Sequence, residues 1–361
     1  MIQLLPIQAA DYPALAVFCA NFPGDIYQAS LWEERFLFWW EKNPVFSAHW
    51  IRGWMLLEET TIVGMLADIP SSVQLFGQQV LVSNFSTWRV QEAYQGESLR
   101  LLSKALTHAK DRLVFNTTPT LDVAAILRSF RFCNLADTLC EYLFVTNTEF
   151  LAWQLRKKKI PKFLAYGLSW TIRWWHKVVR MGFSGTRRNK NGLQVQLLDH
   201  VGEEFDRLWQ RTADYFTFSQ RRTSLDLQWL VYANPIRNLV LFGCYDAKNI
   251  LTGYALFAQF PVSLPFDTIH FVCLDIWSLE RTPWTFVALI QAAIDYSEQN
   301  RFAMVIVPEY NALFKQAALL SGWSIQRTRP SAIYCRFPKG ITFVMGSGES
   351  CLSGYFGDIV F

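Results

Sequence analysis

The sequence predicts an α/β protein made of two similar three-layer units in tandem, each with a mixed sheet between helices. Short apolar segments typical of strands alternate with amphipathic segments typical of helices. The same order of elements then recurs about 190 residues further along the chain. A chain of 361 residues is too long for one ordinary core, and a hydrophobic fraction of 51% excludes a disordered protein. Two packed domains are therefore expected.

The first unit, residues 1–150, is expected to follow the order β, α, α, β, β, β, α, β, α, β, β. The strands are predicted at 2–7, 54–58, 62–69, 80–90, 113–116 and 132–145. The helices are predicted at 11–22, 31–42, from 98 onward and at 121–130. Ser30 and Glu33 form the pattern of a capping box before the second helix, and Asn43-Pro44 is a stop signal after it.

Three landmarks indicate an internal duplication. They are the Asn-Pro pairs at 43–44 and 234–235, the hairpin glycines Gly64 and Gly253, and the aromatic residues Phe132 and Trp323. Their separations of 191, 189 and 191 residues agree within two positions. The second unit, residues 193–361, repeats the order with strands at 193–198, 239–246, 250–260, 268–276 and 303–307 and helices at 203–215, 225–232, 283–300 and 311–320.

Residues 151–192 form a predicted basic linker between the units. Between positions 156 and 190 there are eleven basic residues and no acidic one, and the rest of the chain then holds 23 basic against 30 acidic residues. Leu164, Leu168, Ile172, Trp175 and Val179 recur at helical spacing. The favoured interpretation is a linker helix whose stripe is buried against the two acidic domains. Contact with a membrane surface or nucleic acid is the alternative.

Composition bounds the cellular context and the chemistry. The N-terminal sequence lacks the basic and apolar regions of a secretory signal, and no segment resembles a membrane span of about 18 apolar residues, so a cytoplasmic protein is expected. Seven cysteines without a C-x-x-C pair indicate reduced thiols and not disulfides. Five scattered histidines give no metal-ligand spacing, so no metal is expected.

The segment from Asn84 to Leu102 turns from an apolar strand into an amphipathic helix, and it is the strongest site candidate. Gly96 permits unusual backbone angles and Ser98 is a suitable residue for a helix start. Several free amides would then point at one spot with the helix dipole behind them, which suits a pyrophosphate.

This segment resembles the coenzyme A loop of the GNAT acyltransferase superfamily, whose pattern is Gln/Arg-x-x-Gly-x-Gly/Ala. Gln95, Gly96, Glu97 and Leu99 fit that pattern, whereas Ser98 and Arg100 stand where the family has small residues. The resemblance implies two tandem GNAT-like units and an acyl-CoA lying where the fourth and fifth strands splay. The implied contacts are Trp88, Val90, Gln95, Gly96, Glu97, Ser98, Leu99, Arg100 and Asn116.

The resemblance leaves the catalytic residues unassigned. The family often has a tyrosine acid in its last helix, and that position is Leu127 in the first unit and Ala318 in the second. Candidate bases are Glu92, Asp68, Ser83 and Ser86, but the favoured interpretation of each is an ordinary turn or surface polar residue.

Shifting the loop by 190 residues gives 285–290, which contains no glycine, so one acyl-CoA per chain is expected. The bulky Trp284 and Phe286 would close a second site. The second unit, with polar groups such as His270 and Asp275, would then shape the acceptor pocket.

These observations predict an N- or O-acyltransferase that transfers an acetyl or longer acyl group from CoA. Its acceptor is a small molecule, such as a sugar or an amine, held between the domains. Two alternatives stay open: a Fem-type aminoacyl-tRNA-dependent transferase, which would use the basic linker for RNA, and a non-catalytic protein that binds acyl-CoA or another ligand.

Overall fold

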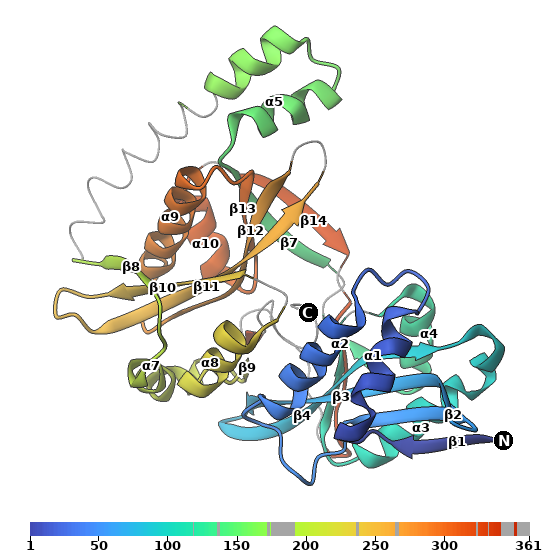
Figure 1. The fold of residues 1–361 in the computed structure, drawn as a ribbon. Helices are drawn as coiled ribbons and strands as arrows, with labels where there is room; N and C mark the ends of the chain where they lie inside the picture. Colours follow the sequence, from blue (N-terminus) through green and yellow to red (C-terminus); the bar gives the residue numbers. More distant parts are fainter. Residues whose placement is uncertain are drawn as a thin grey trace.

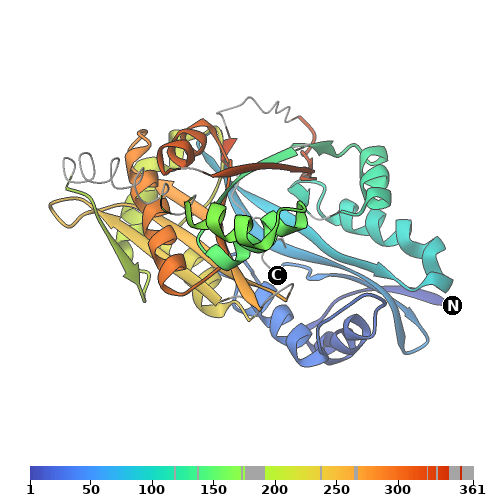
Figure 2. The ribbon, with the colours of Figure 1, turned by 90° about the horizontal axis from the view of Figure 1, so that it is seen from above.

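The computed structural model describes residues 1–117, 119–135, 138–171, 174, 192–235, 238–263, 267–322, 324–330, 332–340 and 350–351. Their strands form two mixed sheets, each packed against helices, and the two sheets lie next to each other (Figures 1 and 2). In Figure 1 the first sheet lies at the lower right and the second at the upper left.

The first sheet has the order β1-β2-β3-β4-β5-β15-β6, with β9 and β16 added alongside β3. Its strands are β1 (Ile2–Pro6), β2 (Gly53–Glu58), β3 (Thr61–Leu75), β4 (Gln78–Val90), β5 (Leu113–Asn116), β6 (Cys133–Asn134), β9 (Phe218–Gln220), β15 (Tyr334–Arg336) and β16 (Ser350–Cys351). One face packs against α1 (Tyr12–Ala20) and α2 (Ala29–Phe36), which continues as a π-helical turn, η2 (Leu37–Glu41). The other face packs against α3 (Ser98–His108) and α4 (Leu121–Ser129). This gives the predicted three layers.

The second sheet has the order β14-β7-β13-β12-β11-β10-β8. Its strands are β7 (Thr138–Val145), β8 (Gln194–Leu198), β10 (Asn238–Tyr245), β11 (Leu251–Val262), β12 (Thr268–Ser278), β13 (Met304–Pro308) and β14 (Ile325–Pro330). Its helices are α7 (Glu203–Thr212), α8 (Ser224–Ala233), α9 (Trp284–Gln299) and α10 (Ala312–Leu320), and α5 (Thr148–Lys157) follows β7. Aromatic and aliphatic residues from this sheet and from α7 to α10 make the largest core cluster.

Strands cross between the two halves of the chain: the second sheet contains β7 from the first half, and the first sheet contains β9, β15 and β16 from the second half. β7 comes from the first half of the chain, yet it lies between β13 and β14 of the second sheet, where Leu143 pairs with Ile306 and with Ile325. β15 comes from the C-terminal part, yet it lies between β5 and β6 of the first sheet, where Cys335 pairs with Phe115. Each sheet is therefore completed by a strand that the sequence places in the other unit.

The predicted order of elements is confirmed in both halves, and Gly64 and Gly253 hold equivalent positions in β3 and β11. Trp323 lies outside the described residues. The division at residues 150 and 192 stays a prediction, and the sheets do not follow it because of the exchanged strands.

Three local predictions were wrong. The strand predicted at 132–145 is two strands in different sheets, because β6 ends at Asn134 and β7 begins at Thr138. The strand predicted to end at residue 69 runs on to residue 75 through Pro70, whose carbonyl accepts from Asn43 Nδ2 (2.9 Å) on the side away from β4. The Ser30 capping box is absent, since α2 already begins at Ala29 after the cap residue Gln28.

Direct contacts also join the two halves. Trp229 of α8 donates its indole Nε1–H to the carbonyl of Phe38 (2.8 Å), and the two rings stack with centroids 4.5 Å apart. β9, which follows α7, pairs with β3 from Val73 to Leu75. Among the described residues, no helix is both long and apolar enough to cross a lipid bilayer.

Candidate functional site

The first sheet opens between β4 and β5, at the position predicted from the sequence. The two strands pair in parallel only from Val82 to Asn84. β4 then continues to Val90 with a bulge at Thr87, whose φ is +52°, whereas β5 ends at Asn116. Asn116 reaches across the opening and donates its Nδ2–H to the carbonyl of Phe85 (3.0 Å).

Buried polar side chains gather around this opening. They are Asp68, Ser83, Asn84, Ser86, Asn116 and Thr117. Within the part of the chain that the structure describes, Asp68 Oδ1, Asn84 Oδ1, Asn116 Oδ1 and Trp88 Nε1 are buried without a hydrogen-bond partner. Most buried polar atoms in proteins are paired, and leaving one unpaired costs about 1–3 kcal/mol. Such a concentration is typical of a place that binds water or a ligand.

Asp68 is the titratable group of this cluster. It lies in the middle of β3, is 3% exposed and accepts a hydrogen bond from Ser83 Oγ (3.0 Å). Burial raises its pKa to about 7, although Arg112, 3.6 Å away, and the bond from Ser83 act in the opposite direction. A carboxyl with this pKa can take up or release a proton near neutral pH. The interpretation of Asp68, Ser83 and Ser86 as turn or surface residues was wrong, because the sheet buries all three; Glu92 is exposed.

The cluster has members on both faces of the sheet. Asp68 lies opposite Phe85 in the register, on the face that packs against α3 and α4. Asn84 lies opposite Ile69, on the face that packs against α1 and α2, and its Nδ2 donates to Ser71 Oγ (2.8 Å). A ligand threaded through the opening would therefore meet polar atoms on both sides.

The loop after β4 differs from the predicted cradle. Residues Glu92–Glu97 form a 3₁₀-helix that runs directly into α3, and the amide of Ser98 donates to the carbonyl of Gln95. The loop amides are thus largely paired within the turn and do not converge on one spot. Gly96 has no left-handed angle, and a Cβ added there would meet nothing within 4 Å. Ser98 and Arg100 stand where the family pattern has small residues, and the chain winds into a helical turn that needs no glycine.

The loop side chains make local contacts. Gln95 Nε2 donates to the carbonyl of Val90 (2.7 Å) at the end of β4, and Tyr94 donates to Glu58. Arg100 pairs with Glu97 on the surface (2.9 Å). The residues that the resemblance implies thus run from the end of β4 through the 3₁₀ turn into α3, apart from Asn116, which ends β5 and bonds to Phe85.

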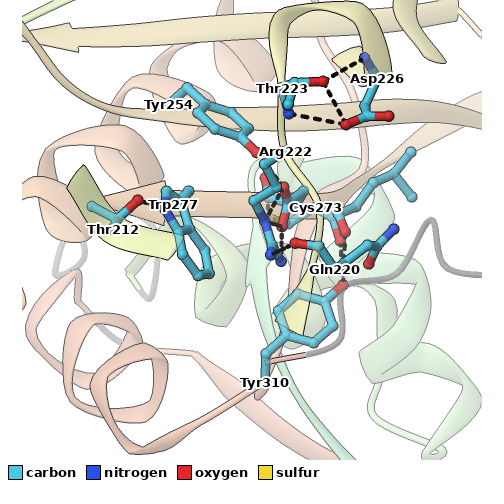
Figure 3. Close-up of polar contacts among 11 residues, drawn as sticks. Thr212, Gln220, Arg222, Thr223, Asp226, Tyr254, Cys273, Trp277 and Tyr310 are labelled. Carbon is cyan, nitrogen blue, oxygen red and sulfur yellow. Dashed lines mark hydrogen bonds and ion pairs between the residues drawn. The ribbon is translucent and has the colours of Figure 1, made fainter. Parts of the chain in front are cut away.

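The second sheet opens at the equivalent position, but its own side chains fill the opening (Figure 3). β12 and β13 pair in parallel only from His270 to Val272. Tyr310 then donates its hydroxyl to the carbonyls of Cys273 (3.1 Å) and Leu274 (3.3 Å). Hydrophobic neighbours of α9 and α10 surround this tyrosine.

A fully buried ion pair lies beside Tyr310. Arg222 and Asp275 have side chains that are 0% exposed, with Arg222 Nε 3.0 Å from Asp275 Oδ2. Arg222 also donates to the carbonyl of Gln220 (2.7 Å), and Tyr254 donates to Asp275 (2.5 Å). The guanidinium lies 4.0 Å from the ring of Trp277. No residue spacing pointed to Arg222, Tyr254 or Tyr310, because their partners come from separate elements.

The other predictions for the second unit have mixed outcomes. Asp275 is held in the ion pair, whereas His270 Nε2 is buried without a partner in the described structure, and burial lowers the pKa of this histidine. A mainly aromatic cavity of about 210 Å³ lies beside Phe286, so this region is narrowed but not closed. Leu127 and Ala318 are 1% and 0% exposed in hydrophobic cores. Neither unit thus offers an acid at that position.

The described residues contain no group of three His, Cys, Asp or Glu side chains placed to hold a metal ion. Six cysteines are free thiols: Cys19, Cys133, Cys140, Cys244, Cys273 and Cys335.

The overall fold is that of GCN5-related acyltransferases. The chain is similar to a GCN5-related N-acetyltransferase from Anabaena variabilis, with 14% identity, a TM-score of 0.58 and coverage of 93% of this chain and 73% of that one. It is also similar to a GCN5-related N-acetyltransferase from Kribbella flavida, with 10% identity, a TM-score of 0.61 and coverage of 93% and 71%. A third similar structure is Saccharomyces cerevisiae N-myristoyltransferase with bound myristoyl-CoA, with 10% identity, a TM-score of 0.54 and coverage of 92% and 82%. The sequence matches no protein-family model and no curated protein.

Proposed function

We propose that the protein is an acyl-CoA-dependent acyltransferase whose co-substrate lies in the opening between β4 and β5. The observation that carries this proposal is the set of unpaired buried polar atoms on Asp68, Asn84, Asn116 and Trp88 at that opening. In the second unit the Tyr310 hydroxyl bonds across the equivalent opening. Similarity of fold to acetyl- and myristoyltransferases supports the same class of reaction.

In this proposal the strands position the reactants. An amine or hydroxyl attacks the thioester carbon, the carbon–sulfur bond breaks, and the thiolate leaves. Most of the rate enhancement in such a transfer comes from holding the two groups in contact. Asp68, with its pKa near 7, is the proposed acceptor of the proton that the nucleophile loses.

The loop must change to bind a pyrophosphate through its amides. The 3₁₀ turn at Glu92–Glu97 would open, which frees amides such as that of Ser98 from its bond to Gln95. The acceptor is proposed to enter between the two halves, where β9 joins the first sheet.

Calorimetry with CoA, acetyl-CoA and longer acyl-CoAs tests the proposal. We expect one molecule bound per chain and at least about tenfold weaker binding in Ser98→Asp, because a carboxylate beside the loop repels phosphate. Ser103→Asp on the exposed side of the same helix is the matched control and should bind like the wild type. The proposal would be overturned if none of the acyl-CoAs bound to the wild type. It would also be overturned if both variants lost acyl-CoA affinity equally.

A further inference from the structure

A helical hairpin connects the two halves and extends away from both sheets (Figure 1, green, at the top). Its first helix, α5, is anchored by Phe150, which packs with Leu143 and Met304 of the second sheet. Its second helix covers residues 162–171. The hairpin is thus fixed to the protein at one end and presents its second helix outward.

The second helix exposes aromatic side chains along one face. Phe163, Tyr166, Trp170 and Trp174 are 75%, 38%, 68% and 62% exposed. Their spacing of i, i+3, i+7 and i+11 places them in one row on a helix. Ala165 and Ser169, both 0% exposed, lie on a different face and make the contact with the protein. Large exposed apolar rows of this kind are rare on a soluble surface and mark interaction sites.

The predicted buried stripe was therefore wrong where the structure describes it. Leu164 and Leu168 are 47% and 44% exposed. Ile172, Trp175 and Val179 lie outside the described residues. The buried side of this helix is formed by Ala165 and Ser169 and not by the leucines.

Exposed basic side chains precede the aromatic row in the same hairpin. Arg156, Lys157, Lys158, Lys159 and Lys162 are exposed, and the sequence from 150 to 190 contains no acidic residue. Lys157 Nζ lies 3.8 Å from the ring of Trp153, so even the one indole on α5 faces a cation. The partner of this surface must be anionic and must also accept aromatic rings.

We propose that the aromatic row and the lysines of this hairpin bind the surface of an anionic phospholipid bilayer. Tryptophan, tyrosine and phenylalanine prefer the boundary between headgroups and acyl chains, and lysines contribute about 1 kcal/mol each near an anionic leaflet. The lysines and the aromatic row would meet the headgroup region together, so in this proposal the hairpin lies on the membrane surface. Bases can also stack on aromatic rings, so binding of single-stranded nucleic acid is the outcome that the test below distinguishes from membrane binding.

Sedimentation of the full chain with vesicles tests this inference. We expect binding to phosphatidylcholine vesicles that contain phosphatidylglycerol, weaker binding at high salt, and little binding to phosphatidylcholine alone. The double variant Phe163→Ser, Trp170→Ser should lose about tenfold in vesicle binding or more. Ile26→Ser is the matched control, because Ile26 is 84% exposed elsewhere on the surface and should not affect binding.

A second variant separates charge from apolar contact. Lys158→Glu with Lys159→Glu should weaken binding to anionic vesicles while the circular dichroism spectrum and acyl-CoA binding stay unchanged. Wild-type vesicle binding by the serine double variant would overturn the proposal. So would tight, salt-sensitive RNA binding in the absence of vesicle binding.

Discussion

The openings in the two sheets have the same strand pairing but differ in the side chains that lie in them. Each lies where a parallel strand pair ends after three residues and where a bulge follows. In the first sheet the polar atoms around the opening are partly unpaired, whereas in the second the Tyr310 hydroxyl bonds across the opening beside the buried Arg222–Asp275 pair. After a duplication, one copy of the unit can stabilise the protein while the other binds a ligand. The fold alone therefore does not say which copy is functional.

The largest expected effect is on the filled opening. Arg222→Met leaves Asp275 buried without its cation, which should lower the free energy of unfolding by about 3–5 kcal/mol. Urea unfolding measures this loss. The double change Arg222→Met, Asp275→Leu should recover much of it, because no charge is then left unpaired. A single variant as stable as the wild type would mean that the pair is solvated and that the second opening is not a closed core.

The open site should respond to pH through Asp68. The folded protein raises the pKa of Asp68 from 3.8 to about 7, so between these values the folded state holds a proton that the unfolded state has lost. The contribution of Asp68 to stability is therefore present below pH 4 and is lost as the pH rises to 7. Asp68→Asn should be about 4 kcal/mol more stable than the wild type at pH 8 and nearly equal at pH 4. Unfolding curves at both pH values check the sign, and a constant difference would contradict it.

The side chains that span the two openings allow a direct comparison. Tyr310→Phe removes bonds to the carbonyls of Cys273 and Leu274, which should cost about 1–2 kcal/mol of stability and leave acyl-CoA affinity unchanged. Asn116→Leu removes the bond to Phe85 and should in addition weaken acyl-CoA binding by about tenfold. Thermal unfolding and calorimetry on both variants separate the two effects. Equal acyl-CoA affinity in both would show that the co-substrate does not lie in the first opening.

The smallest effect is expected at Gly96. Its backbone needs no positive φ and a Cβ would meet no atom within 4 Å, so Gly96→Ala should change the free energy of unfolding by less than about 1 kcal/mol. Gly253→Ala is the contrast, since its Cβ would lie 2.6 Å from the carbonyl oxygen of Trp277. A strong loss of stability in Gly96→Ala would show that the loop adopts another conformation in solution.

The sequence predicted what depends on local periodicity. The order of elements followed from strand and helix patterns and from the repeat, whereas the position of the first opening followed from the resemblance to the GNAT family. The placement of β7 and β15 could not be predicted, because it depends on pairing between residues about 160 to 220 positions apart in the chain. Arg222, Asp275 and Tyr254 also meet only in three dimensions. The loop was predicted to present free amides, but its backbone forms a 3₁₀ turn in which the amide of Ser98 bonds to the carbonyl of Gln95. Residue types at 92–98 do not show whether the amides bond to one another or stay free.

The exchange of strands has a consequence for how the protein is made. On a ribosome, β5 and β6 emerge about 200 residues before β15, which lies between them in the finished sheet. At the usual 5–20 residues per second this delay is roughly 10–40 seconds, during which two strand edges and their apolar faces are open to other chains. The nascent first half should therefore depend on chaperones until residue 336 has been synthesised. A gene cut between the halves would yield two fragments that become stable only by finding each other.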